Sequence, residues 1–320
     1  MTRDPVLTVT DRGLYCPAGD FYIDPHRPVA RAVVTHGHSD HACRGHGAYL
    51  CTPAAAPAIR HRLGRIAVQE LAFGTALRIG GAVVSLHPAG HLPGSAQVRV
   101  EAGGEVWVVS GDYKTEPDGF CEPFAPVRCH TFITESTFAL PVFRWAPEAQ
   151  VVAQIRDWWQ GVAADGGVAV VGAWALGKAQ RVLAALGPGG PGPVLAHPAV
   201  AAMNAVMRAQ GLPLPPAPAL APDAVAPPGA LVIAPPNTLG RQWGPGRCEV
   251  ALVSGWMALR ATARRRGAAR GFALSDHADW EGLNTAIRAT GAERVLVTHG
   301  YTAPFSRWLT EQGHDAQVLG

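Results

Sequence analysis

The chain has 320 residues, of which 48% are hydrophobic and 16% are charged, so the composition is that of a globular protein and excludes a disordered one. Its length allows one large domain or two interleaved domains. A formal charge of +3 is too small to predict a nucleic-acid-binding protein by itself, so any such surface must be local.

The six cysteines include no Cys-x-x-Cys pair, which favours reduced thiols over a disulfide framework. The first residues lack the apolar segment of a signal peptide. The long uncharged stretch 182–207 is interrupted by a run of Gly and Pro, so we expect no membrane span. These features together predict a cytoplasmic protein.

The first chemically informative segment is residues 35–42, Thr-His-Gly-His-Ser-Asp-His-Ala. Residues 7–24 before it predict two short strands with a turn at 11–13, and residues 32–34 predict a buried strand. Residues two apart in an extended segment point the same way, so His36 and His38 can hold one ion together. Asp40 and His41 follow where the chain must turn, and can hold a second ion.

This His-x-His-x-Asp-His pattern resembles the second motif of the metallo-β-lactamase fold. The resemblance implies a metal-dependent hydrolase, but it does not fix the substrate. It further implies that Asp24, at the end of the apolar strand 21–23, orients the metal-binding loop through hydrogen bonds.

The next two motifs of the resemblance follow in order. Thr52-Pro53 predicts the start of a helix that runs to about Arg62, and residues 71–86 are strand-rich. His91, within Ala-Gly-His-Leu-Pro-Gly-Ser-Ala, matches the single histidine of the third motif, whereas His87 is interpreted as a structural or supporting histidine. Strands 98–100 and 106–109 form a predicted hairpin. Asp112, just after it, matches the carboxylate that bridges two ions.

Residues 132–137, a buried strand that ends in Thr-Glu-Ser-Thr, resemble motif A of the β-CASP branch of nucleases through Glu135. Strands and helices alternate between about 147 and 271, which predicts a parallel sheet with right-handed crossovers. The size and pattern are similar to the β-CASP insertion. The proline-rich stretch 212–228 predicts a surface connection.

Residues 272–279 resemble motif B through His277, and residues 295–300 resemble motif C through His299. The resemblance covers nearly the whole chain. It implies an α/β protein, in which a metallo-β-lactamase αββα sandwich (1–146 and 272–320) carries an inserted, Rossmann-like parallel α/β β-CASP domain (147–271). The stretch from 254 to 277 is most similar to the bacterial ligase-associated DNA exonucleases.

The resemblance implies two divalent metal ions, Zn²⁺ and/or Mn²⁺. One ion would be held by His36, His38 and His91, the other by Asp40, His41 and His299, with Asp112 as the bridge. Two neighbouring ions suit attack on a phosphodiester. His277 would act as the general acid and Glu135 would orient it, and Asp40 is counted with these catalytic residues.

Candidate substrate-binding residues lie in the predicted insertion. Lys178 and Arg181 begin a helix after a glycine-bounded loop, a setting that suits phosphates. Arg264 and Arg265 belong to a cluster that also contains Arg260, Arg266 and Arg270, for which contact with a nucleic-acid backbone is favoured over a merely solvated surface. Trp174 and Trp256 could stack a base, but core packing is the favoured interpretation of each.

The leading hypothesis is a metal-dependent phosphodiesterase, a DNA exonuclease in DNA repair with 5′-to-3′ polarity. DNA is the favoured partner, with a functional association to a DNA ligase and no membrane. The alternative is an RNA-processing nuclease of the β-CASP branch, because many DNA-acting relatives have an apolar residue where this chain has His299. A non-catalytic binding protein is disfavoured because no metal ligand is missing.

Overall fold

The computed structural model describes residues 5–259 and 262–320, so Arg260 lies outside the described residues. The chain forms two compact units. Unit 1 comprises Met1–Phe143 and His277–Gly320, and unit 2 comprises Arg144–Asp276. The expected α/β class is confirmed, whereas the assignment of 1–146 and 272–320 to one named domain and of 147–271 to another stays a prediction. Within the described residues, no helix combines the length and the hydropathy needed to cross a bilayer.

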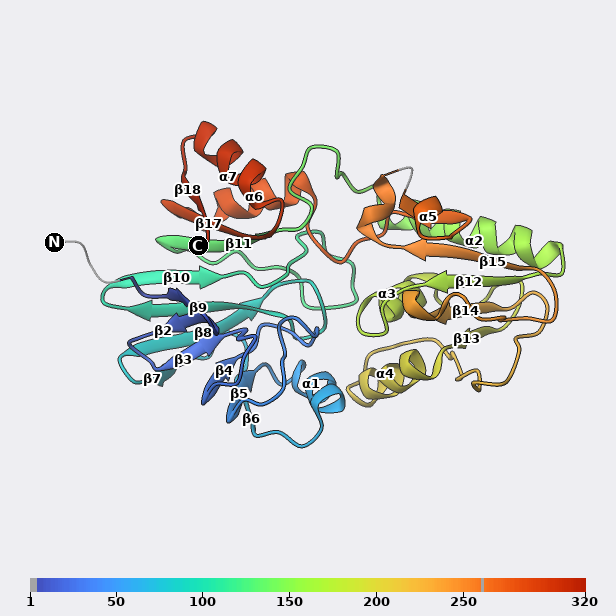
Figure 1. The fold of residues 1–320 in the computed structure, drawn as a ribbon, viewed down its shortest axis with the longest axis horizontal. Helices are drawn as coiled ribbons and strands as arrows, with labels where there is room; N and C mark the ends of the chain where they lie inside the picture. The colour runs from blue at the N-terminus through green and yellow to red at the C-terminus, as the bar shows by residue number, and fades with distance from the viewer. Residues whose placement is uncertain (1–4, 260–261) are drawn as a thin grey trace. The chain divides into compact units, whose positions relative to one another are not determined.

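The first sheet of unit 1 has six strands in sequence order (Figure 1). They are β1 (Thr8–Thr10), β2 (Gly13–Cys16), β3 (Phe21–Ile23), β4 (Arg31–Val33), β5 (Ala48–Cys51) and β6 (Val68–Glu70). The first three are antiparallel neighbours and the rest continue in parallel. Three strands therefore occupy residues 7–24, where the sequence predicted two, because the turn at 17–20 divides the second predicted strand.

The second sheet of unit 1 has the order β18-β17-β11-β10-β9-β8-β7. Its strands are β7 (Leu77–Ile79), β8 (Ala82–Pro88), β9 (Ala96–Ala102), β10 (Glu105–Val109), β11 (Thr131–Ser136), β17 (Arg294–Gly300) and β18 (Asp315–Val318). The predicted hairpin is confirmed as β9 and β10. Strands β10, β11, β17 and β18 are parallel, so the carboxyl ends of β10, β11 and β17 meet at one edge.

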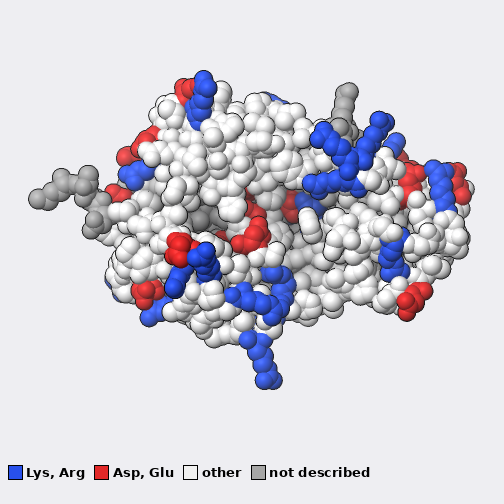
Figure 2. Space-filling model, viewed as in Figure 1, with Lys and Arg blue, Asp and Glu red and all other residues white. Residues whose placement is uncertain are grey.

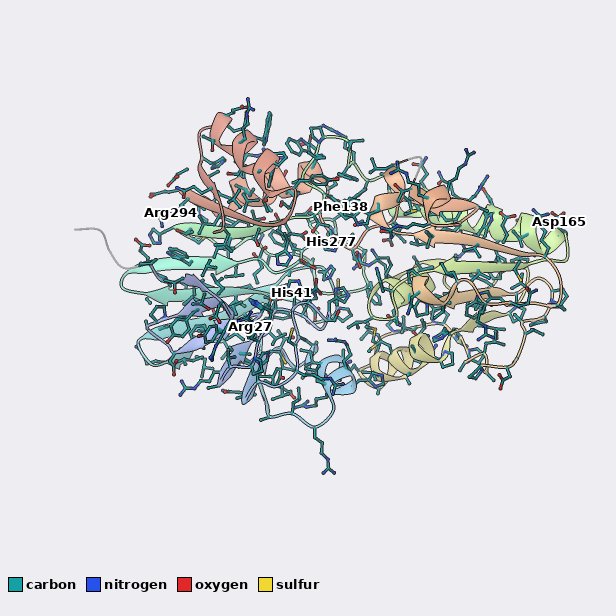
Figure 3. All side chains as sticks on the ribbon, viewed as in Figure 1. Arg27, His41, Phe138, Asp165, His277 and Arg294 are labelled. Atoms are coloured by element: carbon teal, nitrogen blue, oxygen red, sulfur yellow. The ribbon has the colours of Figure 1, made fainter. Side chains whose placement is uncertain are left out.

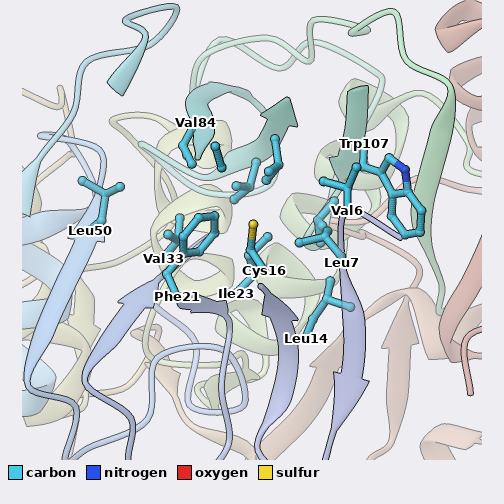
Figure 4. Packing of buried hydrophobic residues seen from close by; sticks show 14 of the residues in the cluster. Val6, Leu7, Leu14, Cys16, Phe21, Ile23, Val33, Leu50, Val84 and Trp107 are labelled. Atoms are coloured by element: carbon cyan, nitrogen blue, oxygen red, sulfur yellow. The ribbon is translucent and has the colours of Figure 1, made fainter. Parts of the chain in front are cut away.

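The two sheets pack face to face over one apolar cluster that includes Phe21, Ile23 and Val84 (Figure 4). Successive residues of β11 point to opposite faces of the second sheet. Ile133 packs in the cluster between the sheets, and Phe132 packs in the cluster beneath α6 (Trp280–Thr290) and α7 (Thr302–Glu311). On the far face of the first sheet, α1 (Ala56–Leu63) packs through Ile59. Unit 1 is therefore a helix–sheet–sheet–helix sandwich.

Unit 2 contains a five-stranded sheet of order β13-β14-β12-β15-β16. All four neighbouring pairs are parallel, which confirms the predicted parallel sheet. Its strands are β12 (Val168–Gly172), β13 (Val194–Ala196), β14 (Leu231–Ala234), β15 (Cys248–Val253) and β16 (Arg270–Phe272). Its helices are α2 (Glu148–Ala164), α3 (Lys178–Leu186), α4 (Pro198–Ala209) and the short α5 (Thr262–Arg265), with 3₁₀ turns η1 (Pro236–Thr238) and η2 (Gly255–Ala258).

Candidate metal centre

Four predicted ligands of unit 1 converge. His36 and His38 follow β4, His91 lies between β8 and β9, and Asp112 follows β10. One donor atom from each lies within 4.8 Å of all the others, which is a grouping that could hold a metal ion. These loops meet because the strands before them end at neighbouring positions of the two packed sheets.

The donor spacing suits a tetrahedral metal site. His38 Nδ1 lies 3.2 Å from His36 Nε2 and 3.1 Å from His91 Nε2. Asp112 Oδ2 lies 3.5 Å from His36 Nε2 and 3.8 Å from His91 Nε2. Ligand atoms that are about 2.0–2.1 Å from a tetrahedral zinc lie roughly 3.4 Å from one another. The residues present therefore fit a metal ion.

His41 is oriented as a ligand by Asp24. Asp24 Oδ2 accepts a hydrogen bond from His41 Nδ1 at 2.7 Å, so Nε2 is the nitrogen that can bind a metal ion in exchange for its proton. Asp24 also accepts hydrogen bonds from the Thr35 amide at 2.8 Å and from the Thr35 hydroxyl at 2.6 Å. The predicted hydrogen bonds between Asp24 and this loop are therefore present. His41 Nε2 is buried and has no hydrogen-bond partner among the residues that the structure describes. An orphaned buried nitrogen of this kind fits a metal ligand.

The electrostatics of the cluster also favour a cation. Burial alone would lower the pKa of His41, but the carboxylates of Asp112 and Asp24 outweigh it and raise that pKa to about 10. Burial, together with the neighbouring imidazoles, lowers the pKa of His36 well below its usual value. Burial would raise the pKa of Asp112, but the imidazoles around it, His41 foremost, lower it. A neutral His36 and an ionised Asp112 are the forms that bind metals.

The predicted second ligand set is more open than the first. His41 Nε2 lies 3.6 Å from Asp112 Oδ1 and 3.8 Å from Asp40 Oδ2, and the His41 ring stacks on His299 with centroids 5.4 Å apart. Asp112 thus turns one oxygen to His36 and His91 and the other to His41, as a bridging carboxylate would. The side chain of Asp40 is 65% exposed, so a second ion would lie near the surface.

His299 owes its position to a β-bulge. Glu135 pairs with Thr298 and Ser136 pairs with Gly300, so His299 is the extra residue of β17. Its φ is +49°, a left-handed conformation that non-glycine residues rarely adopt. The Ser136 hydroxyl lies 2.5 Å from the His299 carbonyl and 3.0 Å from that of Thr298, and holds the bulge.

Replacing Gly300 by Ala should destabilise this bulge. Gly300 has a φ of +93°, and an added Cβ would lie 2.4 Å from the backbone oxygen of Ser136. Gly313 has the same φ with nothing within 4 Å of its Cβ position, so Gly313→Ala is a matched control for the backbone strain alone. We expect the control to lower the free energy of unfolding by about 1–3 kcal/mol. Gly300→Ala should lower it by about 2 kcal/mol more. Urea denaturation measures both, and equal losses would contradict the close contact.

A second pair of side chains adjoins the metal cluster. The two oxygens of Glu135 each lie 2.9 Å from His277 Nδ1, and His277 Nε2 lies 3.9 Å from Asp112 Oδ2. Glu135 is buried and also accepts a hydrogen bond from the Tyr113 amide at 2.9 Å. Phe138 packs edge-on against the His277 ring (Figure 3). His277 is therefore held with Nε2 directed at the candidate metal ligands.

Two residues that help to hold this centre together, Thr35 and Ser136, were not predicted from the sequence. The Thr35 hydroxyl donates a hydrogen bond to Asp24, which orients His41. The Ser136 hydroxyl donates a hydrogen bond to the backbone carbonyl of His299. Thr35 immediately precedes His36, and Ser136 immediately follows Glu135, each near the end of a strand. A small hydroxyl residue in such a position is the signal that could have found them.

The predicted substrate-binding residues of unit 2 differ in exposure. Lys178 is buried and its ammonium group forms an ion pair with the buried Asp276. Arg181 is 1% exposed. Their burial favours an internal role, and their contact with phosphate stays a prediction. Arg264 and Arg265 are exposed, as the predicted backbone contact requires.

Core packing was the wrong expectation for Trp174, whose side chain is 57% exposed. Trp174 lies in the loop that follows β12. Trp256, in contrast, packs against a small apolar cluster that includes Met257 and Leu252, as expected.

Comparisons with known proteins identify relatives with nucleic-acid enzyme names. No family model matches the chain. It is 33% identical over 314 residues to a "Probable DNA ligase" of Opitutus terrae, with 96% of this chain and 30% of that protein covered. It is 29% identical over 126 residues to "Ribonuclease TTHA0252" of Thermus thermophilus, with 39% of this chain and 28% of that protein covered. The chain thus spans about a third of the length of these relatives or less.

The fold also has a counterpart among solved structures. A protein of unknown function from Enterococcus faecalis matches with a TM-score of 0.57 and 11% sequence identity, over 86% of this chain and 76% of that one. At this identity the likeness concerns the fold alone.

Proposed function

We propose that this chain is a metal-dependent phosphodiesterase that acts on nucleic acid. The observation that carries the proposal is the cluster of His36, His38, His91 and Asp112, with the Glu135–His277 pair directed at the same carboxylate. A lactamase-type hydrolase would not need a buried carboxylate to orient a further histidine at the cluster. The names of the two relatives, a DNA ligase and a ribonuclease, support nucleic acid as the substrate class.

The side chains divide the chemistry between them. When bound, two divalent ions, Zn²⁺ and/or Mn²⁺, would activate a water and neutralise charge on the phosphate oxygens. His36, His38 and His91 would hold the first ion, and Asp40, His41 and His299 the second, with Asp112 between them. Glu135 fixes the Nδ1 proton of His277, so the proton on Nε2 is the one that can pass to the leaving sugar oxygen. The ring need not reorient during this transfer, because Glu135 is itself buried and anchored.

The substrate proposed is DNA, degraded from an end in the 5′-to-3′ direction during repair. The identity to a protein named as a DNA ligase over 96% of this chain supports DNA and a functional association with a ligase. We assign the two units to a metallo-β-lactamase domain and a β-CASP insertion as part of the same proposal. A cytoplasmic location also remains a prediction. RNA is the second candidate, favoured by the ribonuclease relative and by His299.

Matched single-stranded DNA and RNA, labelled at the 5′ or the 3′ end, test this proposal. With added Mn²⁺ or Zn²⁺ we expect stepwise loss from the 5′ end of DNA. Asp40→Ala should reduce the rate at least about 100-fold, since even residues that only support metal ligands are worth 10–100-fold. Internal cleavage of RNA, without cleavage of DNA, would contradict the DNA exonuclease and support an RNA-processing nuclease. Equal rates for wild type and Asp40→Ala would refute the metal-dependent activity.

A further inference from the structure

The strand order of the parallel sheet in unit 2 predicts a crevice at its carboxyl edge. Strands β12 and β15 are parallel neighbours, with Gly172 opposite Leu252. After β12 the chain crosses to β13 on one side, and after β15 it continues to β16 on the other side. Loops that leave neighbouring strands in opposite directions open a crevice, and ligands of parallel α/β sheets bind at such a switch point. The loop after β12 contains Trp174, and η2, after β15, contains Trp256.

Trp174 is unusual in its exposure. It is the only exposed Phe, Trp or Tyr side chain within residues 5–259 and 262–320. The other large exposed hydrophobic side chains of this part of the chain are all valines. A lone exposed valine needs no explanation, but an indole presents a large apolar face to water.

The loop that presents Trp174 is held by a buried network. Gln180 is fully buried; its amide oxygen accepts a bond from the Gly177 amide at 2.8 Å, and its nitrogen donates to the Ala175 carbonyl at 3.0 Å. The same nitrogen donates to Asn204 on α4 at 2.8 Å. The Trp174 carbonyl accepts from the Ala179 amide at 3.0 Å. The indole is thus exposed on an ordered loop, so a ligand that stacks on it needs to order little of the protein.

A basic patch lies near the carboxyl end of β15, since Ala263 of α5 packs against the cluster that contains Leu252 and Met257. The segment 255–275 contains no acidic residue, and its Arg264, Arg265 and Arg266 are exposed in and just after α5. Helix α5 contacts both η2 and β16. Figure 2 shows blue side chains gathered over this part of unit 2.

We propose that this edge of unit 2 binds single-stranded nucleic acid, with Trp174 as the base-stacking residue and Arg264, Arg265 and Arg266 as phosphate contacts. This inference rests on the proposed function and narrows its substrate. Stacking on an indole requires a base with a free face, and each base offers one regardless of sequence. Bases within a duplex are already stacked on both sides. The edge therefore selects unpaired strands over duplex.

Binding of a 5′-fluorescein-labelled oligothymidylate, followed by anisotropy with the full-length protein in EDTA, tests the stacking residue. Trp174→Ala should weaken binding roughly 10-fold, and Trp174→Phe should stay within about 3-fold of wild type because it keeps a π-face. Val225→Ala, which removes another exposed hydrophobic side chain of unit 2, should leave binding unchanged. A hairpin duplex should bind more weakly than the single strand, and only single-strand binding should depend on Trp174.

The arginines are tested by salt dependence. Replacing Arg264, Arg265 and Arg266 together by Ala should reduce the slope of the logarithm of the binding constant against the logarithm of the salt concentration by about 2. Arg247→Ala is the matched control, because Arg247 precedes β15 at the opposite edge of the sheet. Unchanged single-strand binding by Trp174→Ala, or equal loss with the duplex, would overturn the proposal.

These outcomes are independent of catalysis, since EDTA leaves only binding to be measured. Hydrolysis of bis-p-nitrophenyl phosphate by the wild-type protein with Mn²⁺ tests the proposed function separately. An inactive protein that binds single strands through Trp174 would refute the nuclease and support the binding edge. A protein that hydrolyses the ester, but whose binding of single strands is unchanged by Trp174→Ala, would support the nuclease and refute the binding edge.

Discussion

His277→Ala should lower kcat for an oligonucleotide by about 10²–10⁴-fold, the usual value of a positioned general acid. Its Nδ1 is fixed by Glu135 at 2.9 Å, and its Nε2 faces the Asp112 side of the cluster. Because His277 is not among the predicted metal ligands, the bound metal and the KM should change little. Steady-state kinetics and metal analysis of the purified variant measure these quantities.

The leaving group distinguishes a general acid from a structural histidine. A p-nitrophenyl ester departs as a stable anion and needs no proton, so His277→Ala should impair its hydrolysis far less than that of DNA. Equal losses for both substrates would argue against proton donation. His87→Ala is the matched control, because His87 is a partly buried histidine bonded to Ser85 outside the cluster.

Asp112→Asn should abolish metal binding at the proposed bridge, with a loss of metal affinity greater than about 100-fold and a corresponding loss of turnover. The carboxylate lies within 3.9 Å of four imidazole rings and turns a different oxygen to His41 than to His36 and His91. An amide keeps the shape of the side chain, but it presents only one acceptor oxygen and no charge. Metal content by mass spectrometry and calorimetric titration with Zn²⁺ or Mn²⁺ measure the effect.

Two other carboxylates provide a graded comparison. Asp24→Asn should lower metal affinity only about 10–100-fold, because Asp24 orients His41 without being a ligand. Asp118→Asn removes a buried carboxylate that pairs with Lys114 elsewhere, so it should leave the metal content unchanged even if stability falls. Full metal occupancy in Asp112→Asn would contradict the bridging role.

The sequence predicted the ligand cluster because the ligands follow apolar strands. Strand ends are readable from short apolar runs, and parallel neighbours such as β10 and β11 bring their ends to one edge. His36 and His38 share a direction for the same local reason. The pairing of His36 with His38 followed from their spacing, whereas His91 and Asp112 were expected as ligands through the family resemblance, and the structure brings all four together.

Features that depend on packing at a distance were not predictable. The exposure of Trp174 depends on which way its loop leaves β12, and hydrophobicity alone favours the opposite. The short strand β16 begins with Arg and Gly, which weaken any strand signal, and exists because β15 offers it a parallel edge. The left-handed His299 depends on a bulge opposite Ser136, a residue far away in the sequence.

The place of β11 has a consequence for synthesis on the ribosome. All six residues of β11 are buried, and it lies between β10 and β17. Its partner β17 begins only at Arg294, after the whole of unit 2. At roughly 5–20 residues per second, β11 waits on the order of 10 s for that partner. During this interval it is an apolar sheet edge that can pair with another nascent chain. The edge of β11 is therefore the part of unit 1 that stays unpaired longest during synthesis.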